Sequence, residues 1–127
     1  MLQFWRVCAQ ARRVCRRWRE FEANQAIAAA LCVGVVDSFH SGIGGGGISL
    51  VKYAGQEPTV FDYRETAPAA AHKNMFDGMS PIASRWGGLA AAVPGEIRGY
   101  EELHKEYGRV PWSLLFEPAA TVARRGF

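Results

Sequence analysis

The sequence lacks the cysteine patterns that assign many small proteins to a class. It has only three cysteines among 127 residues, with no C-x-x-C pair and no cysteine–histidine spacing typical of a metal site. Neither a disulfide framework nor a metal module is therefore indicated. Cys32 lies in an alanine-rich apolar run, where a small buried core residue is the simplest interpretation. We predict no metal and no cofactor.

Long hydrophobic runs are also missing. The longest one, residues 26–36, is about half of the roughly 20 residues that a membrane-spanning helix needs. Near the N-terminus, Arg6, Arg12 and Arg13 interrupt the apolar residues, so that no secretory leader is recognisable. The sequence therefore assigns no compartment.

Positive charge is concentrated in the first 21 residues. These hold six arginines against one glutamate, whereas the remaining 106 residues hold nine basic and eleven acidic side chains. A nucleic-acid-binding domain carries its basic residues on the folded face, so we expect no nucleic-acid partner. The tryptophan-containing segment 1–21 could form a membrane-surface helix. We favour a solvated arm or a leader outside the fold, and do not expect it to bind membranes.

The body of the chain predicts a mixture of helices and strands. Residues 22–36 are rich in alanine with apolar residues at four-residue spacing, which predicts a buried helix. Residues 48–53 and 59–64 predict two strands of an antiparallel hairpin, because a five-residue turn sequence joins them. A second helix is predicted at 96–107, where Gly108 follows the last apolar position.

The remaining segments are less regular. Thr66-Ala67-Pro68 predicts the start of a short helix reaching residues 75–76, followed by a loop over 77–88 that is rich in Gly, Ser and Pro. Pro111 predicts a last helical stretch that runs to Arg125. Pro118 should break or restart this stretch, because a proline inside a helix removes a hydrogen bond.

A glycine run precedes the first predicted strand. Its Gly42-x-Gly44-x-x-Gly47 spacing matches a dinucleotide fingerprint, and Asp62 imitates the acid that binds ribose. That fingerprint follows a strand and opens a helix, whereas here a helix comes before and a strand after. We therefore interpret the glycines as backbone that passes close to another element or to a ligand.

Arg64 is the strongest candidate for a functional residue. It follows an apolar strand and precedes the Thr-Ala-Pro corner. A guanidinium can align two N–H groups with the two oxygens of a carboxylate, so Arg64 beside the glycine run could bind a carboxylate ligand. The alternative is a structural ion pair with Glu65 or Asp62.

Other polar patterns are weaker. Glu101-x-x-His104 is half of a di-iron carboxylate pattern, but the sequence has no second copy, so we predict a solvated helix face. His40 and His72 have no partner at a spacing typical of a catalytic or metal site.

These motifs together resemble the γ-glutamyltransferase (glutathione hydrolase) family over about residues 23–127. The resemblance rests on segments in the family's order and spacing: Gly42-Ile43-Gly44-Gly45-Gly46-Gly47, Arg64-Glu65-Thr66-Ala67-Pro68, Gly87-Gly88-Leu89-Ala90, Val93-Pro94-Gly95, Tyr107-Gly108-Arg109-Val110-Pro111-Trp112 and Ala123-Arg124-Arg125-Gly126-Phe127. The chain departs from the family at Glu20–Gln25 and slightly at Asp37–Ser41, and segment 1–21 matches nothing in it.

The resemblance implies an α/β (α+β) fold that is part of an N-terminal-nucleophile hydrolase αββα sandwich. It implies γ-glutamyl transfer or hydrolysis of glutathione by an N-terminal threonine whose amino group acts as base. In the family that threonine, the oxyanion hole and the groups that hold the α-amino nitrogen belong to a small subunit. We therefore expect residues 22–127 to be a partial large-subunit domain, which needs the rest of that subunit and the small subunit as partners.

The resemblance assigns one residue of this chain to substrate binding. The arginine of the family's R-E-T-A-P motif binds the α-carboxylate of the γ-glutamyl group, and it corresponds to Arg64. Glu65 would orient Arg64 from behind. No catalytic residue is expected in this chain, so the 127 residues alone should be inactive. The alternative is a non-catalytic fragment that acts as a binding or regulatory piece.

Overall fold

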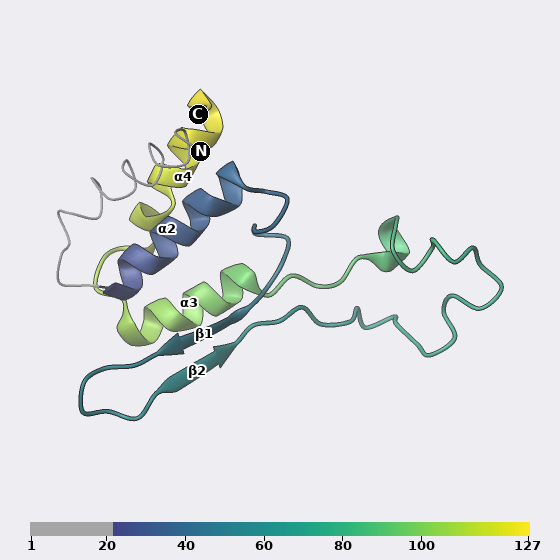
Figure 1. Ribbon diagram of the computed structural model, residues 1–127, viewed down its shortest axis with the longest axis horizontal. Coiled ribbons are helices and arrows are strands. Elements are labelled where there is room, and N and C mark those ends of the chain that lie inside the picture. Colours follow the sequence, from purple (N-terminus) through teal and green to yellow (C-terminus); the bar gives the residue numbers. More distant parts are fainter. Residues whose placement is uncertain (1–21) are drawn as a thin grey trace.

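The computed structural model describes residues 22–127, so the expectations for segment 1–21, a solvated arm or a membrane-surface helix, lie outside the described residues. Helices and strands are mixed, which confirms the α+β class (Figure 1). In chain order the elements are α2 (Glu22–Val36), β1 (Ile48–Val51), β2 (Thr59–Asp62), the 3₁₀ turn η2 (Gly88–Ala90), α3 (Glu96–Tyr107), the 3₁₀ turn η3 (Trp112–Leu115) and α4 (Glu117–Arg125).

The two strands form the antiparallel hairpin that the sequence predicts. Ile48 pairs with Asp62 at one end and Val51 with Thr59 at the other, so both strands are two residues shorter than expected. Beyond Asp62, one more pair of backbone hydrogen bonds joins Gly47 and Tyr63. The strands then end because the glycine run leaves the hairpin, and the carbonyl of Gly45 accepts hydrogen bonds from the start of α3 instead.

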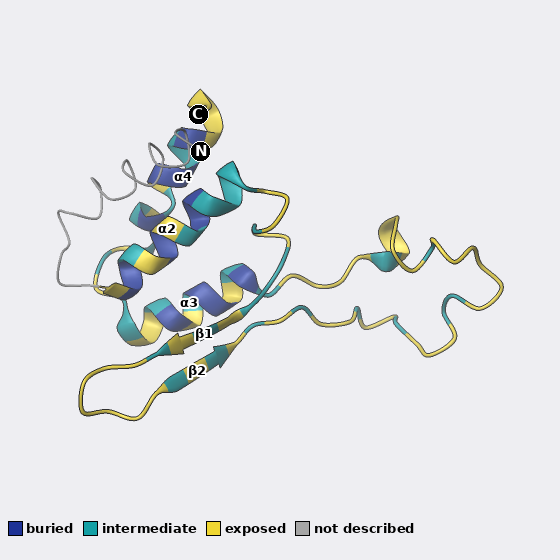
Figure 2. Ribbon diagram, viewed as in Figure 1, coloured by how far each residue is buried: buried dark blue, intermediate teal, exposed yellow. Residues whose placement is uncertain are grey.

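The core lies between the three α-helices and one face of the hairpin. Helix α2 packs against both α3 and α4, and the buried positions of all three meet there (Figure 2). The apolar members are Ile27, Leu31, Cys32, Tyr100, Leu103, Leu115, Ala119 and Val122. Burying each large apolar side chain contributes about 1.5–3 kcal/mol. The expectation that Cys32 is a small core residue is confirmed.

The opposite face of the hairpin is uncovered by the described residues. Ile48, Leu50 and Val60 lie on it and are 63%, 66% and 58% exposed. Alternate positions on the two strands, including Val51 and Phe61, point instead to the helices. The hairpin thus has one face on the core and an apolar face open, with all the helices on one side (Figure 1).

Residues 67–92 form an arm that extends away from the helices (Figure 1). An antiparallel bridge between Thr66 and Val93 closes its base, with N···O distances of 3.2 and 2.9 Å. The predicted short helix reaching residues 75–76 is wrong, because only turns are found there. A helix that short is marginal in water unless it packs against another element, and here the arm projects away from the core.

The last helical stretch is broken, as Pro118 predicted. Turn η3 ends at Leu115, and α4 begins at Glu117 with Pro118 in its first turn. Proline is tolerated there because the first N–H groups of a helix have no partner within it. Within residues 22–127, no helix has the length and hydrophobicity needed to cross a bilayer.

Candidate functional site

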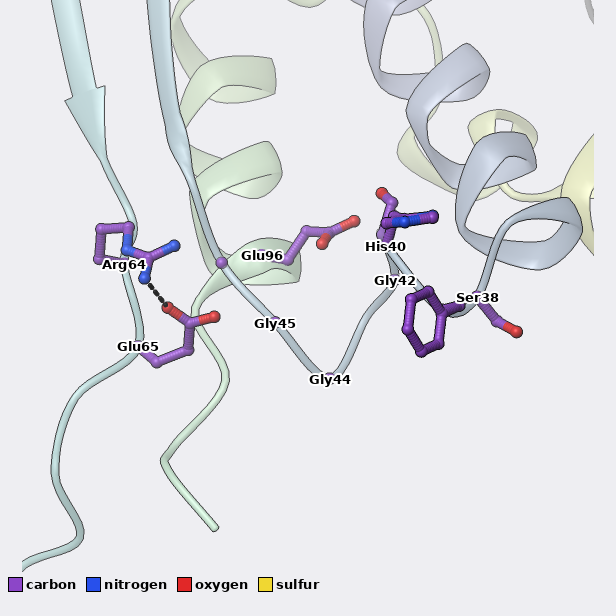
Figure 3. A pocket seen from close by; sticks show the side chains of 11 residues that line it. Ser38, His40, Gly42, Gly44, Gly45, Arg64, Glu65 and Glu96 are labelled. Atoms are coloured by element: carbon purple, nitrogen blue, oxygen red, sulfur yellow. Dashed lines mark ion pairs between the residues drawn. The ribbon is translucent and has the colours of Figure 1, made fainter. Parts of the chain in front are cut away.

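The glycine run, the end of the hairpin and the start of α3 enclose an open hollow of about 320 Å³ (Figure 3). Gly42, Gly44, Gly45 and Gly46 line it with bare backbone. The other lining residues are Ser38, Phe39, His40, Ser41, Arg64, Glu65 and Glu96. A wall without side chains leaves room for a ligand beside one guanidinium and two carboxylates.

Arg64 stands at this hollow two residues after β2 ends. Its backbone N–H donates to Asp62 Oδ1 at 3.0 Å. Its guanidinium Nη2 lies 3.4 Å from Glu65 Oε2, as Figure 3 shows. The Arg64 side chain is 64% exposed, and a guanidinium has five N–H donors, so one such ion pair leaves donors for a ligand. Exposed ion pairs of this kind contribute only about 0–1 kcal/mol.

Glu65 is less exposed than its partner, at 25%. Its other carboxylate oxygen, Oε1, lies beside Gly45, 3.5 Å from where a Cβ on that glycine would be. Glu65 therefore connects the glycine run to Arg64. The structure brings together the two residues that the sequence singled out, and it realises both interpretations of Arg64, an ion pair and a position on a pocket wall.

Glu96 is the residue of this site that the sequence reasoning missed. It is 4% exposed, and its Oε1 accepts a hydrogen bond from the Tyr100 hydroxyl at 3.0 Å. Burial, together with this carboxylate, raises the pKa of Tyr100. Glu96 begins α3, where a negative charge interacts favourably with the helix dipole. An acidic residue directly after Pro94-Gly95, at a helix start, was the available signal.

The other polar candidates have structural partners. Glu101 pairs with Arg98 at 2.7 Å and with Lys105 at 3.5 Å. His104 Nε2 lies 2.7 Å from the carbonyl oxygen of Val110. Residues 22–127 contain no cluster of three or more side chains suited to a metal ion.

Two histidines and the dinucleotide pattern also resolve. His40 lies on the rim of the hollow, where its Nδ1 is 3.0 Å from Asp37 Oδ1. His72 is exposed on the arm. The glycine run follows α2 and opens into β1, so the helix needed after a dinucleotide fingerprint is replaced by a strand.

The geometry agrees with what known proteins share with this chain. The model of the γ-glutamyltranspeptidase family matches residues 22–127. The chain belongs to this family. Glutathione hydrolase proenzyme 1 of Schizosaccharomyces pombe is 52% identical over 103 residues, which are 81% of this chain and 16% of that protein. The resemblance read from the motifs is thereby confirmed.

Solved structures of γ-glutamyltranspeptidases share the fold. The Helicobacter pylori γ-glutamyltranspeptidase superposes with a TM-score of 0.83 and 34% identity, over 93% of this chain and 36% of that one. The Bacillus anthracis transpeptidase CapD gives a TM-score of 0.74 and 30% identity, over 95% and 37%. The chain thus spans about a third or less of these relatives.

Proposed function

We propose that this chain contributes the carboxylate-binding wall of a γ-glutamyl site, and that Arg64 is the residue that binds the α-carboxylate of the donor. The enzyme would transfer or hydrolyse the γ-glutamyl group of glutathione and related compounds. The observation that carries the proposal is the position of Arg64 on a hollow whose facing wall is glycine backbone. Family membership and the glutathione hydrolase name of its relatives support the reaction.

The chemistry fits the residues present. The α-carboxylate of a glutamyl donor is planar and anionic, and a guanidinium can donate two parallel N–H groups to it. The Arg64 side chain is largely exposed, so little desolvation opposes ligand binding before the site is closed. Glu65 would hold the guanidinium in plane from its far side through the 3.4 Å ion pair.

The bond-breaking step would use groups outside these 127 residues. An N-terminal threonine on a small subunit would attack the γ-carbonyl, with its own amino group as base. Arg64 acts on the other end of the donor, where it fixes the distance between the α-carboxylate and the nucleophile. Correct orientation of reacting groups lowers the barrier by several kcal/mol, on the order of 7–11 in favourable cases.

The test uses an assembled enzyme. Residues 22–127 replace the matching segment of the S. pombe proenzyme, and γ-glutamyl-4-nitroanilide hydrolysis is measured. We expect Arg64→Ala to reduce kcat/KM roughly 100-fold, because truncating one partner of a charge pair costs about 2–5 kcal/mol. Arg64→Lys should recover only part of this, since an ammonium lacks the planar pair of donors.

The matched control is Arg85→Ala. Arg85 lies on the arm and is absent from the lining of the hollow. It should retain the activity of the unmodified chimaera. Equal activity of the Arg64→Ala and Arg85→Ala enzymes would rule out the assignment of Arg64.

A further inference from the structure

The backbone that carries Arg64 passes between two glycines that belong to different segments. Gly46 lies in the glycine run and Gly95 immediately precedes α3. The carbonyl of Gly45 accepts hydrogen bonds from the N–H groups of Gly95 and Glu96, at 2.9 and 3.0 Å. These two bonds tie the glycine run to α3 while the chain of residues 63–65 runs beside both.

Neither position has room for a side chain. A Cβ on Gly46 would lie 2.3 Å from the carbonyl oxygen of Tyr63 and 3.1 Å from the Cα of Arg64. A Cβ on Gly95 would lie 2.1 Å from the same oxygen and 3.2 Å from the carbonyl oxygen of Arg64. All these neighbours are backbone atoms, which cannot rotate away, so an added methyl group must displace the chain around Arg64.

Backbone conformation is not the reason for these glycines. Four glycines of the described chain have positive φ, and neither Gly46 nor Gly95 is among them. Gly95 has φ −110° and ψ −17°, values that an alanine adopts readily. Close approach to Tyr63 and Arg64 is therefore what requires glycine at these positions.

The residue before Arg64 is also fixed through its side chain. The Tyr63 hydroxyl lies 2.6 Å from Ser49 Oγ, and its ring packs edge-on against Tyr100 with a centroid distance of 5.7 Å. A Cβ on Gly99 would lie 2.1 Å from Tyr63 Cγ, so the ring lies directly on that glycine. Backbone and side chain of Tyr63 together hold the Cα of Arg64, whereas its guanidinium remains largely exposed.

We propose that Gly46 and Gly95 are positioning residues that set where the Arg64 guanidinium stands in the γ-glutamyl site. This rests on the function proposed above. A long, exposed side chain has no contacts of its own to fix its origin, so the origin is fixed by the backbone on either side. Displacement of a binding group by about 1 Å can cost on the order of 100-fold in rate.

The experiment separates positioning from general stability by using two substrates in the chimaeric enzyme. One is γ-glutamyl-4-nitroanilide, and the other is 4-aminobutyryl-4-nitroanilide, which lacks only the α-carboxylate. The ratio of the two kcat/KM values reports the contact between Arg64 and that carboxylate. Arg64→Ala should lower this ratio roughly 100-fold. Gly46→Ala and Gly95→Ala should each lower it about tenfold, mainly through KM of the carboxylate-bearing substrate.

The double variants complete the cycle. In the Arg64→Ala background, adding Gly95→Ala should cause no further loss in the ratio, because both changes act on one contact. Gly88→Ala is the matched control, since no described atom lies within 4 Å of a Cβ there and its φ is not positive. It should leave the ratio unchanged.

Each other outcome has a defined meaning. If Gly46→Ala and Gly95→Ala slow both substrates equally, the glycines serve packing alone and the inference is overturned. Failure of both variants to yield folded enzyme, with Gly88→Ala intact, would overturn it too, because the glycines would then be a folding requirement. A ratio unaffected by Arg64→Ala would instead remove the proposed function itself.

Discussion

The hydroxyl of Tyr100 donates a hydrogen bond to the buried carboxylate of Glu96, one turn earlier in α3, at 3.0 Å. Glu96 lines the hollow beside Arg64, and Tyr100 belongs to the core beneath it. This contact therefore connects the helical core to the wall of the candidate site.

The contact predicts a pH dependence of stability. Burial raises the pKa of Tyr100, and Glu96 raises it further, so the phenol keeps its proton to higher pH in the folded chain than in the unfolded chain. Its stabilising contribution is then complete below pH 10.0, the ordinary pKa, and is lost as the pH rises further. We expect Tyr100→Phe to be less stable by about 1–3 kcal/mol at neutral pH, because the carboxylate of Glu96 loses a donor.

The measurement is urea unfolding of the unmodified chain and of Tyr100→Phe between pH 7 and pH 11. The difference in unfolding free energy should shrink above pH 10, since the ionised phenolate no longer donates to Glu96. Other titrating groups cancel in this difference. A difference that stays constant, or that widens with pH, would contradict the assignment.

The ion pair of Glu65 with Arg64 predicts a modest kinetic effect. Glu65→Gln keeps the size of the side chain and removes its charge, so the guanidinium loses one orienting contact. We expect KM for γ-glutamyl-4-nitroanilide in the chimaera to rise by about fivefold or less, in line with about 0.2–1 kcal/mol for exposed pairs. Glu57→Gln, in the hairpin turn, is the control. A loss as large as that of Arg64→Ala would mean that Glu65 contacts the substrate itself.

The 127-residue chain by itself should not hydrolyse γ-glutamyl compounds. The proposed nucleophile and oxyanion hole lie on a small subunit, and a bound carboxylate without an attacking group gives no turnover. The check is γ-glutamyl-4-nitroanilide hydrolysis by the purified chain at high concentration. A rate above the uncatalysed one, abolished by Arg64→Ala, would show that the chain has a nucleophile of its own.

The open face of the hairpin predicts association in solution. Ile48, Leu50 and Val60 form a contiguous apolar surface, and exposed apolar patches favour contact with another protein surface. We expect the isolated chain to elute from size-exclusion chromatography above its monomer mass of 14.0 kDa. Replacing Leu50 and Val60 by threonine should shift it towards the monomer, whereas Lys52→Thr should not.

A clean monomer with a cooperative melting transition would instead favour an independent small domain. That result would leave the open face without a partner in solution. It would also weaken the expectation that this chain is a partial domain.

Several elements could be predicted from local sequence. The bounds of α2 and α3 agree with the expected helices, because their apolar residues recur at helical spacing and glycine ends α3. The hairpin was found through its turn, although each strand is two residues shorter. The helix expected at residues 66–76 is wrong, because the helix-start signal there was not supported by packing against the core.

The site divides in the same way. Arg64 was found because an isolated arginine after an apolar strand is visible in sequence, and Glu65 through its place beside it. Glu96 was missed because nothing local indicates that its carboxylate is buried under Tyr100 beside a hollow formed by residues about fifty positions earlier.

The sequence by itself determined the helical and extended segments, the family, and the arginine most suited to a carboxylate, because these follow from side-chain periodicity and from short motifs. Only the tertiary structure decided that Gly46 and Gly95 close on the Tyr63 carbonyl from two sides and thereby fix the backbone of Arg64. The physical reason is that close approach depends on atoms contributed by three separate segments, and no segment carries that distance within its own sequence.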